Sequence, residues 1–219
     1  MRGSCVLLQL NDRIYAVTAG HIHEGEKPSQ FMFPYEVDSN RFLPMCMSFN
    51  IKTDYSKSKA HEDILIFEIW RDKIQMEFFN QNTIFDITSS DKLIRAKDQK
   101  YFISGFPNEL QDVDYEGKGL RNQACQIEIS EVYEIGLPGI KEFKFSTNAG
   151  LASFSGFSGG GVFSLIPQSA KYFPQFEGIL LQATSTEWMI GRFLQAELIR
   201  EYILKQQSDS NDYTVTSYN

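Results

Sequence analysis

The stretch GFSGGGVFSLI at residues 156–166 places one serine among four glycines and then continues directly into apolar residues. Glycine reaches backbone conformations with positive φ that other residues resist, and it lets two backbone segments approach closely. One interpretation is a structural loop before a strand. The other is a turn that presents Ser158 as a nucleophile and then enters a strand that supports it.

Runs of β-branched and aromatic residues, bounded by turn residues, recur along the rest of the chain. Their lengths suit strands rather than helices, and several alternate apolar with polar residues. The first two runs flank Asn11 and Asp12, a pair favoured where a hairpin reverses. The predicted strands lie at 3–10, 13–19, 62–70, 100–106, 124–135, 142–147, 160–166 and 177–185. We therefore expect a largely β protein.

One segment, 193–207, has the period of an amphipathic helix, with charged residues opposite its apolar face. The apolar face consists of Leu194, Leu198, Ile199, Tyr202 and Ile203. The residues at 208–219 are polar and have no core pattern, so they are expected to form a tail. The most polar interior connection, 86–99, predicts the boundary between an N-terminal half, 1–90, and a C-terminal half, 91–192.

Composition excludes several classes of protein. The 219 residues include 42% hydrophobic residues, enough for a substantial core. The net charge is −7 and there is no basic run, which argues against a nucleic-acid partner. No apolar stretch approaches the roughly 18 residues of a membrane span, so no membrane association is expected. The three cysteines are far apart and include no CxxC pair, which favours a reducing, cytoplasmic location.

Two further fragments contain the residue types that could activate Ser158. AVTAGHIH at 16–23 ends a predicted strand with His21, and HEDILIFEI at 61–69 opens another with Asp63. A serine hydroxyl needs an imidazole to accept its proton, and that imidazole needs a carboxylate to fix its tautomer. Glu62 is an alternative carboxylate, but the apolar run directly after Asp63 favours Asp63 at the entrance of a strand.

Together the three fragments resemble the motifs of trypsin-like serine peptidases with the chymotrypsin fold. VTAGH resembles the histidine motif of that family, EDILIFEI its aspartate strand and GFSGGGVF its serine motif. They follow in the family order, at intervals of 42 and 95 residues. The resemblance implies an all-β fold of two six-stranded antiparallel barrels, at 1–90 and 91–192. The active site would lie in the cleft between them, and a C-terminal helix would follow.

The same resemblance implies a role for each site residue. His21 would be the general base and acid, Asp63 would orient it, and Ser158 would be the nucleophile. The amides of Gly156 and Ser158 would form an oxyanion hole, which stabilises the charge on the attacked carbonyl. The reaction would be hydrolysis of a peptide bond in a protein or peptide substrate, with no cofactor and no metal.

Departures from the family pattern bear on location and regulation. Phe157 stands where secreted digestive members have the aspartate that pairs with a newly cut N-terminus, so activation by propeptide cleavage is not expected. Ile22 stands where relatives with disulfides have cysteine. We expect an intracellular, bacterial-type peptidase domain that, if it is regulated, responds to a protein partner or a ligand.

The substrate pocket is predicted by position. In this family the residue six places before the nucleophile lies at the floor of the primary specificity pocket, and here it is Ala152. The opposite wall would come from 178–184, which includes Gln182 and Ala183 and has no acidic residue. An uncharged pocket predicts a preference for small or apolar side chains.

Two other chemistries are less consistent with the sequence. GFSGG also fits the serine elbow of α/β-hydrolases, but in that fold the histidine follows the serine and a helix follows the elbow. All three histidines precede Ser158. A metal site made of His21, His23, His61 and Glu62 is the other alternative, and no cysteine or second acid has ligand spacing near these residues.

Two other functions stay open beside that of an active endopeptidase. The peptidase fold could serve as a catalytically silent module that binds peptides or acts as a scaffold. The activity could also be latent until a partner binds. Small peptidases of this kind occur beside bacterial immunity and cell-death proteins, and only that analogy suggests such a context here.

Overall fold

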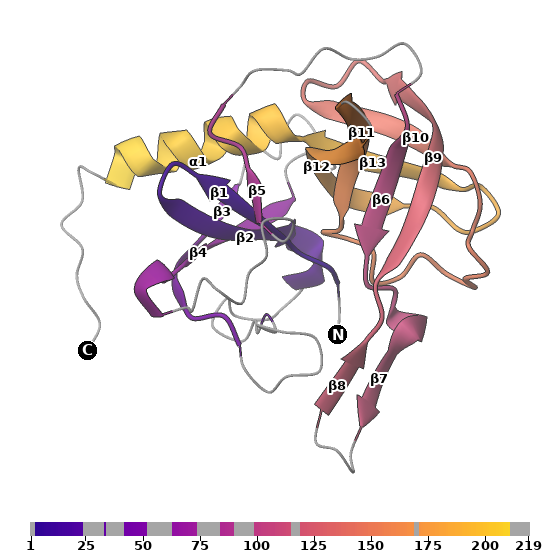
Figure 1. The fold of residues 1–219 in the computed structure, drawn as a ribbon, viewed down its shortest axis with the longest axis horizontal. Helices are drawn as coiled ribbons and strands as arrows, with labels where there is room; N and C mark the ends of the chain where they lie inside the picture. The colour runs from indigo at the N-terminus through magenta and orange to yellow at the C-terminus, as the bar shows by residue number, and fades with distance from the viewer. Residues whose placement is uncertain are drawn as a thin grey trace.

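The computed structural model describes residues 3–23, 33, 42–51, 63–73, 84–89, 99–114, 119–168 and 171–210. Within these ranges the chain is mostly β-strand, as predicted, and contains one α-helix, which follows the last strand (Figure 1). Strands of the first half lie together on one side of the molecule, and the C-terminal barrel lies beside them (Figure 1).

Five strands of the N-terminal half form one sheet with the order β3-β4-β2-β1-β5. The strands are Val6–Leu10 (β1), Arg13–Ala19 (β2), Met45–Ile51 (β3), Ile64–Ile69 (β4) and Ile84–Asp86 (β5). The pairing is antiparallel except between β1 and β5. β1 and β2 form the predicted hairpin, and the turn residue Asn11 has a φ of 57°, a left-handed conformation that asparagine tolerates.

The N-terminal sheet is not closed among the described residues, so the second six-stranded barrel expected from the sequence is not shown. β5 adds a short parallel edge strand, where only antiparallel pairs were expected. β4 is buried on both faces, because alternate side chains enter two different apolar clusters. Ile64 and Ile66 pack toward the C-terminal half, whereas Leu65 and Phe67 pack in the cluster that contains Phe33.

The C-terminal half contains a closed, six-stranded antiparallel barrel with the order β10-β13-β12-β11-β6-β9. Its strands are Tyr101–Gly105 (β6), Cys125–Glu134 (β9), Ile140–Phe145 (β10), Gly161–Gln168 (β11), Lys171–Ala183 (β12) and Ile190–Gln195 (β13). Buried aromatic rings fill much of its core: Phe143, Phe145, Phe154, Phe157 and Phe193. This half therefore provides a rigid support for the loop that contains Ser158.

A separate two-stranded hairpin extends from the barrel. It consists of β7, Gln111–Asp114, and β8, Gly119–Asn122, which pair only with each other among the described residues. It projects away from the body of the molecule (Figure 1). A short 3-10 turn, Asn108–Leu110, joins β6 to this hairpin.

Helix α1 spans Ala196–Ser210 and so begins three residues later than the predicted segment, 193–207. Residues 193–195 complete strand β13, which pairs with β10 and β12. The helix also includes the first residues of the predicted polar tail, whose remainder, 211–219, lies outside the described residues. Ile199 and Ile203 are fully buried in a cluster to which both halves contribute.

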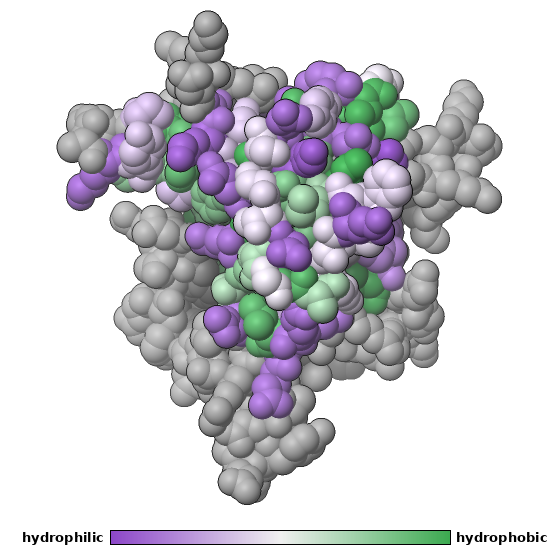
Figure 2. Space-filling view, turned by 90° about the vertical axis from the view of Figure 1, so that its right-hand side faces the viewer, coloured by the Kyte–Doolittle hydropathy of each residue, from purple (hydrophilic) through white to green (hydrophobic). Residues whose placement is uncertain are grey.

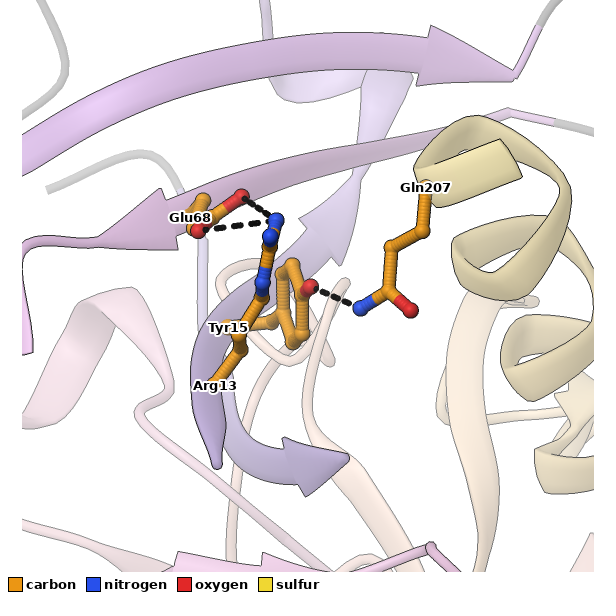
Figure 3. Close-up of polar contacts among 4 residues, drawn as sticks. All are labelled: Arg13, Tyr15, Glu68 and Gln207. Atoms are coloured by element: carbon orange, nitrogen blue, oxygen red, sulfur yellow. Dashed lines mark hydrogen bonds and ion pairs between the residues drawn. The ribbon is translucent and has the colours of Figure 1, made fainter. Parts of the chain in front are cut away.

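A polar contact also ties the helix to the N-terminal sheet (Figure 3). The side-chain amide of Gln207 donates to the hydroxyl of Tyr15 in β2, at 2.6 Å. On the neighbouring positions of β2 and β4, Arg13 and Glu68 form an ion pair at 3.4 Å. The helix therefore contacts both halves of the chain, whose relative position decides whether a site can form between them.

The outer face of the barrel mixes hydrophilic and hydrophobic side chains (Figure 2). No helix among the described residues is long and apolar enough to cross a membrane.

Candidate active site

His21 and Asp63 lie at the same end of two neighbouring strands. His21 follows β2 in a short 3-10 turn, Gly20–His23, and Asp63 directly precedes β4, which pairs with β2. The N–H of Gly20 donates to the carbonyl oxygen of Asp63 at 2.7 Å. A Cβ at position 20 would overlap the Asp63 carboxylate. The glycine before His21 therefore allows the imidazole and the carboxylate to approach each other.

The imidazole of His21 bridges a carboxylate and a hydroxyl. Its Nδ1 lies 2.6 Å from Oδ2 of Asp63, and its Nε2 lies 3.0 Å from Oγ of Ser158. An ionised carboxylate can only accept, so the neutral imidazole donates from Nδ1 and has its lone pair on Nε2. The Ser158 hydroxyl then donates to Nε2. The structure thus brings together all three residues that the sequence singles out.

The backbone around Ser158 is held by hydrogen bonds at four successive carbonyl oxygens. The carbonyl oxygen of Ser155 accepts a hydrogen bond from the N–H of Asn108 (2.8 Å), and that of Phe157 accepts one from the N–H of Gly160 (2.7 Å). Ser4 donates to the other two: its hydroxyl to the carbonyl oxygen of Gly156 (2.7 Å) and its N–H to that of Ser158 (2.8 Å). Because each carbonyl is bonded, the plane of each peptide group is fixed. The loop is therefore preorganised, although it is rich in glycine.

Two N–H groups of this loop are free to bind another molecule. The amides of Gly156 and Ser158 have no hydrogen-bond acceptor within the described part of the chain. In a trans peptide the N–H points away from the C=O. The bonded carbonyls of Ser155 and Phe157 therefore aim these two N–H groups away from the atoms that hold the loop. Two unpaired donors beside a hydroxyl can bind an oxygen that becomes negatively charged.

Two glycines of the loop have conformations and neighbours that exclude a side chain. Gly156 has a φ of 93° and Gly159 a φ of 85°, both in the left-handed region. A Cβ at position 156 would lie 2.6 Å from the carbonyl oxygen of Phe106, and one at position 159 would overlap the backbone of Ser4. At these two positions only glycine fits, because of the backbone conformation and the close neighbours. The need for a flexible loop does not explain these glycines.

Phe157 anchors the loop in the barrel. Its ring is completely buried and packs edge-on against Phe154, with the ring centroids 6.2 Å apart. Gly105 makes room for it, because a Cβ there would lie 2.8 Å from the Phe157 ring. Apolar burial therefore fixes the residue next to the nucleophile.

Of the predicted pocket residues, Ala152 lies in the loop before Ser158, and Gln182 and Ala183 lie at the end of β12. Ala152 is exposed, and its carbonyl oxygen accepts a hydrogen bond of 3.3 Å from the hydroxyl of Thr186. Gln182 and Ala183, at the end of β12, lead into the loop that contains Thr186. The N–H of Ala152 donates to both carboxylate oxygens of Glu109, at 3.0 and 3.1 Å. An acidic group therefore lies beside the position where only uncharged residues were expected.

The contacts of Ser4 and Glu109 have no signal in the sequence. Ser4 belongs to a predicted strand, and Glu109 lies in a short turn after β6. Each finds its partners far along the chain: the hydroxyl of Ser4 bonds to Gly156, 152 positions away, and Glu109 bonds to Ala152, 43 positions away. Only the tertiary fold reveals these roles.

Neither Cys5 nor Cys125, the two cysteines whose side chains the structure describes, is a good nucleophile near neutral pH. Burial raises the pKa of the Cys5 thiol to about 12, so the thiol stays protonated near neutral pH. Burial, followed by the charge of Glu109, also raises the pKa of Cys125. Ser158 is therefore the better candidate for a nucleophile, because its hydroxyl lies against an imidazole.

No group of histidine, cysteine and acidic residues that could hold a metal ion occurs within the described ranges. The alternative metal site included His61 and Glu62, which lie outside these ranges, as does the side chain of His23.

No protein-family model matches the sequence, and no curated protein matches it at a significant level. Function is therefore inferred from the geometry of the site.

Proposed function

We propose that this protein is a serine endopeptidase of the trypsin-like type, with His21, Asp63 and Ser158 as its catalytic triad. One observation carries the proposal. A single imidazole is hydrogen-bonded to a carboxylate at 2.6 Å and to a serine hydroxyl at 3.0 Å, and the two partners come from opposite halves of the chain. An imidazole that accepts the proton of a serine hydroxyl while a carboxylate orients it needs both of these contacts.

In the first half of the proposed reaction, Oγ of Ser158 attacks the carbonyl carbon of the substrate while Nε2 of His21 takes the hydroxyl proton. Asp63 stabilises the imidazolium that forms and remains ionised. The N–H groups of Gly156 and Ser158 donate to the oxygen of the tetrahedral intermediate. The C–N bond then breaks, and His21 gives its proton to the departing amine. An ester between Ser158 and the acyl part of the substrate remains.

In the second half a water molecule attacks this ester, and His21 takes a proton from the water. The new tetrahedral intermediate collapses, the bond from carbon to Oγ breaks, and His21 returns the proton to Ser158. The carboxylic acid product leaves, and the free hydroxyl is restored. The same imidazole acts as base and acid in both steps, which is why its contact with Asp63 must persist throughout.

The proposal extends to the fold and the substrate. The N-terminal sheet would be the described part of a second barrel, which would make the molecule a chymotrypsin-like double barrel. Peptide substrates would place a small or apolar side chain next to Ala152, Gln182 and Ala183. The carboxylate of Glu109 is hydrogen-bonded to the Ala152 amide, so an acidic group lies beside this pocket. A substrate series should therefore also include a peptide with a basic side chain next to Ala152.

A fluorophosphonate probe tests the proposal, since it phosphonylates an activated serine. We expect the wild type to be labelled and Ser158→Ala to remain unlabelled. Ser130→Ala is a matched control, because Ser130 is an exposed serine whose hydroxyl bonds only to a barrel carbonyl in the described structure. Absence of labelling of the folded wild type under any condition would reject the peptidase and favour a silent peptide-binding module.

A further inference from the structure

Ser4 is a buried polar residue next to the nucleophile loop. It lies just before β1 in the N-terminal half and is 3% exposed. All of its polar groups are bonded. Its N–H donates to Ser158 O (2.8 Å), its hydroxyl donates to Gly156 O (2.7 Å) and accepts from Phe106 N–H (2.7 Å), and its carbonyl accepts from the Thr18 hydroxyl (2.5 Å).

The Ser4 hydroxyl is oriented by its two partners. Because the N–H of Phe106 occupies one lone pair of Oγ, the hydroxyl hydrogen points to the carbonyl of Gly156. That carbonyl belongs to a glycine with a φ of 93°, which has no side chain to restrict its rotation. The hydrogen bond from Ser4 therefore supplies a restraint that the glycine itself lacks.

The backbone of Ser4 restrains the other residue of the predicted oxyanion hole. Its N–H donates to the carbonyl of Ser158, so one residue holds the carbonyls of both Gly156 and Ser158. Thr18 in β2 in turn holds the carbonyl of Ser4. A chain of bonds thus runs from the strand that precedes His21 to the loop that contains the nucleophile. It crosses from one half of the molecule to the other.

We propose that Ser4 is a positioning residue that holds the oxyanion hole in its binding geometry. The proposal rests on the proposed peptidase function. The Ser4 side chain does not touch the reacting atoms. It bonds to the carbonyl of Gly156 and so fixes the peptide group between Gly156 and Phe157, which lies between the two peptide groups that contain the N–H of Gly156 and the N–H of Ser158. An oxyanion hole contributes mainly to the transition state, because its donors meet the charge that develops there. Loss of the Ser4 hydroxyl should therefore affect turnover more than substrate binding.

The test compares Ser4→Ala with the wild type in steady-state kinetics on a peptide substrate. We expect kcat to fall roughly 10- to 100-fold, part of the loss seen when an oxyanion donor is removed, while KM changes less than about 3-fold. The affinity of a peptide aldehyde, whose adduct places an oxyanion in the hole, should fall in parallel with kcat. An unchanged kcat, or an increase confined to KM, would overturn the proposal.

Ser164→Ala is the matched control. Ser164 is also a completely buried serine, and its hydroxyl donates to Glu177 inside the barrel, away from the site. Removing it should lower the free energy of unfolding, as Ser4→Ala does, but leave kcat within about 2-fold of the wild type. An equal loss of kcat in both variants would show that general destabilisation explains the effect.

Hydrogen exchange of the segment 154–160 tests the positioning role without any activity. In Ser4→Ala the hydrogen-bonded amides of Phe157, Gly159 and Gly160 should exchange faster than in the wild type, because the loop loses its restraint. Unchanged exchange rejects the proposal for Ser4, whereas an unlabelled wild type rejects the peptidase itself. If Ser4→Ala does not fold, Ser4→Cys replaces it. The thiol keeps the volume but is a weak donor, so the same changes are expected at a smaller size.

Discussion

Gln207, near the end of α1, donates a hydrogen bond to the hydroxyl of Tyr15, a residue 192 positions earlier in the chain. Tyr15 lies in β2, the strand that leads to His21, whereas α1 continues directly from a strand of the C-terminal barrel. A second bond runs from the Arg200 guanidinium to the carbonyl of Thr88 at 3.2 Å. The helix therefore connects the half with the imidazole to the half with the nucleophile.

The apolar face of this helix should be essential for stability. Ile203 is completely buried in the cluster shared by both halves. Ile203→Ala should lower the free energy of unfolding by about 2–5 kcal/mol, because it leaves a cavity in that cluster. Urea unfolding measures the change. Glu201→Ala, at an exposed position of the same helix, should stay within about 0.5 kcal/mol of the wild type. Equal effects would mean that the helix is not docked through this face.

Stability should depend on the Cys5 thiol at alkaline pH. Burial raises its pKa from 9.0 to about 12 in the folded protein. Below the ordinary pKa the thiol is protonated in both states and has no effect. Between the two values the unfolded chain loses the proton and the folded protein keeps it. The free energy of unfolding therefore falls as pH rises.

Urea unfolding of the wild type and Cys5→Ala at pH 8 and about pH 10.5 measures this dependence. The wild type should lose more stability between the two pH values than the variant, because only the wild type has a thiol at position 5. The difference between the two proteins removes the contribution of other groups that titrate in this range. Identical losses would mean that the pKa of the Cys5 thiol is not raised in the folded protein.

Much of the fold could be predicted because the strands are apolar and bounded by turn residues. The run ILIF after Asp63 and the pair Asn11–Asp12 fix β4 and the first hairpin by local pattern alone. Other strands have no such pattern. β7 and β8, QDVD and GLRN, are short and polar, and β13 overlaps a segment with helical period. Residues 193–195 are in a strand because they pair with β10 and β12. The sequence pattern within this segment does not predict that pairing.

In the candidate site, too, some residues are predicted from local sequence and others depend on the tertiary fold. His21, Asp63 and Ser158 are found from their motifs, because a nucleophilic serine requires these residue types with small neighbours. Ser4 and Asn108 could not be found, because a buried serine and a turn asparagine occur throughout proteins with other roles. Their effect depends on which carbonyl they face in the folded chain, and that is a property of tertiary packing.

Gly156→Ala tests whether the nucleophile loop needs a residue without a side chain. A Cβ there would lie 2.6 Å from Phe106 O and Asn108 N, so the backbone must move and the amide must turn. We expect kcat to fall about 100-fold or more, the loss associated with one oxyanion donor. The affinity of a peptide aldehyde measures the same loss in binding.

Gly136→Ala is the control for that substitution. Gly136 also has a positive φ, 73°, but a Cβ there would meet nothing within 4 Å. This variant should lose about 1 kcal/mol of stability from backbone strain and retain wild-type turnover. If both variants lost turnover to the same degree, strain alone would account for the effect of Gly156→Ala.

Asp63→Asn tests the carboxylate of the proposed triad. An asparagine keeps the size of the side chain, but its amide can donate to Nδ1 and so hold His21 in the wrong tautomer, with the proton on Nε2. The Ser158 hydroxyl then has no acceptor, and kcat should fall about 10⁴-fold while circular dichroism shows an unchanged fold. Asp72→Asn, an exposed aspartate in the turn after β4, should retain full turnover. Turnover of Asp63→Asn near that of Asp72→Asn would remove Asp63 from the mechanism, because the 2.6 Å contact with Nδ1 would then have no catalytic consequence.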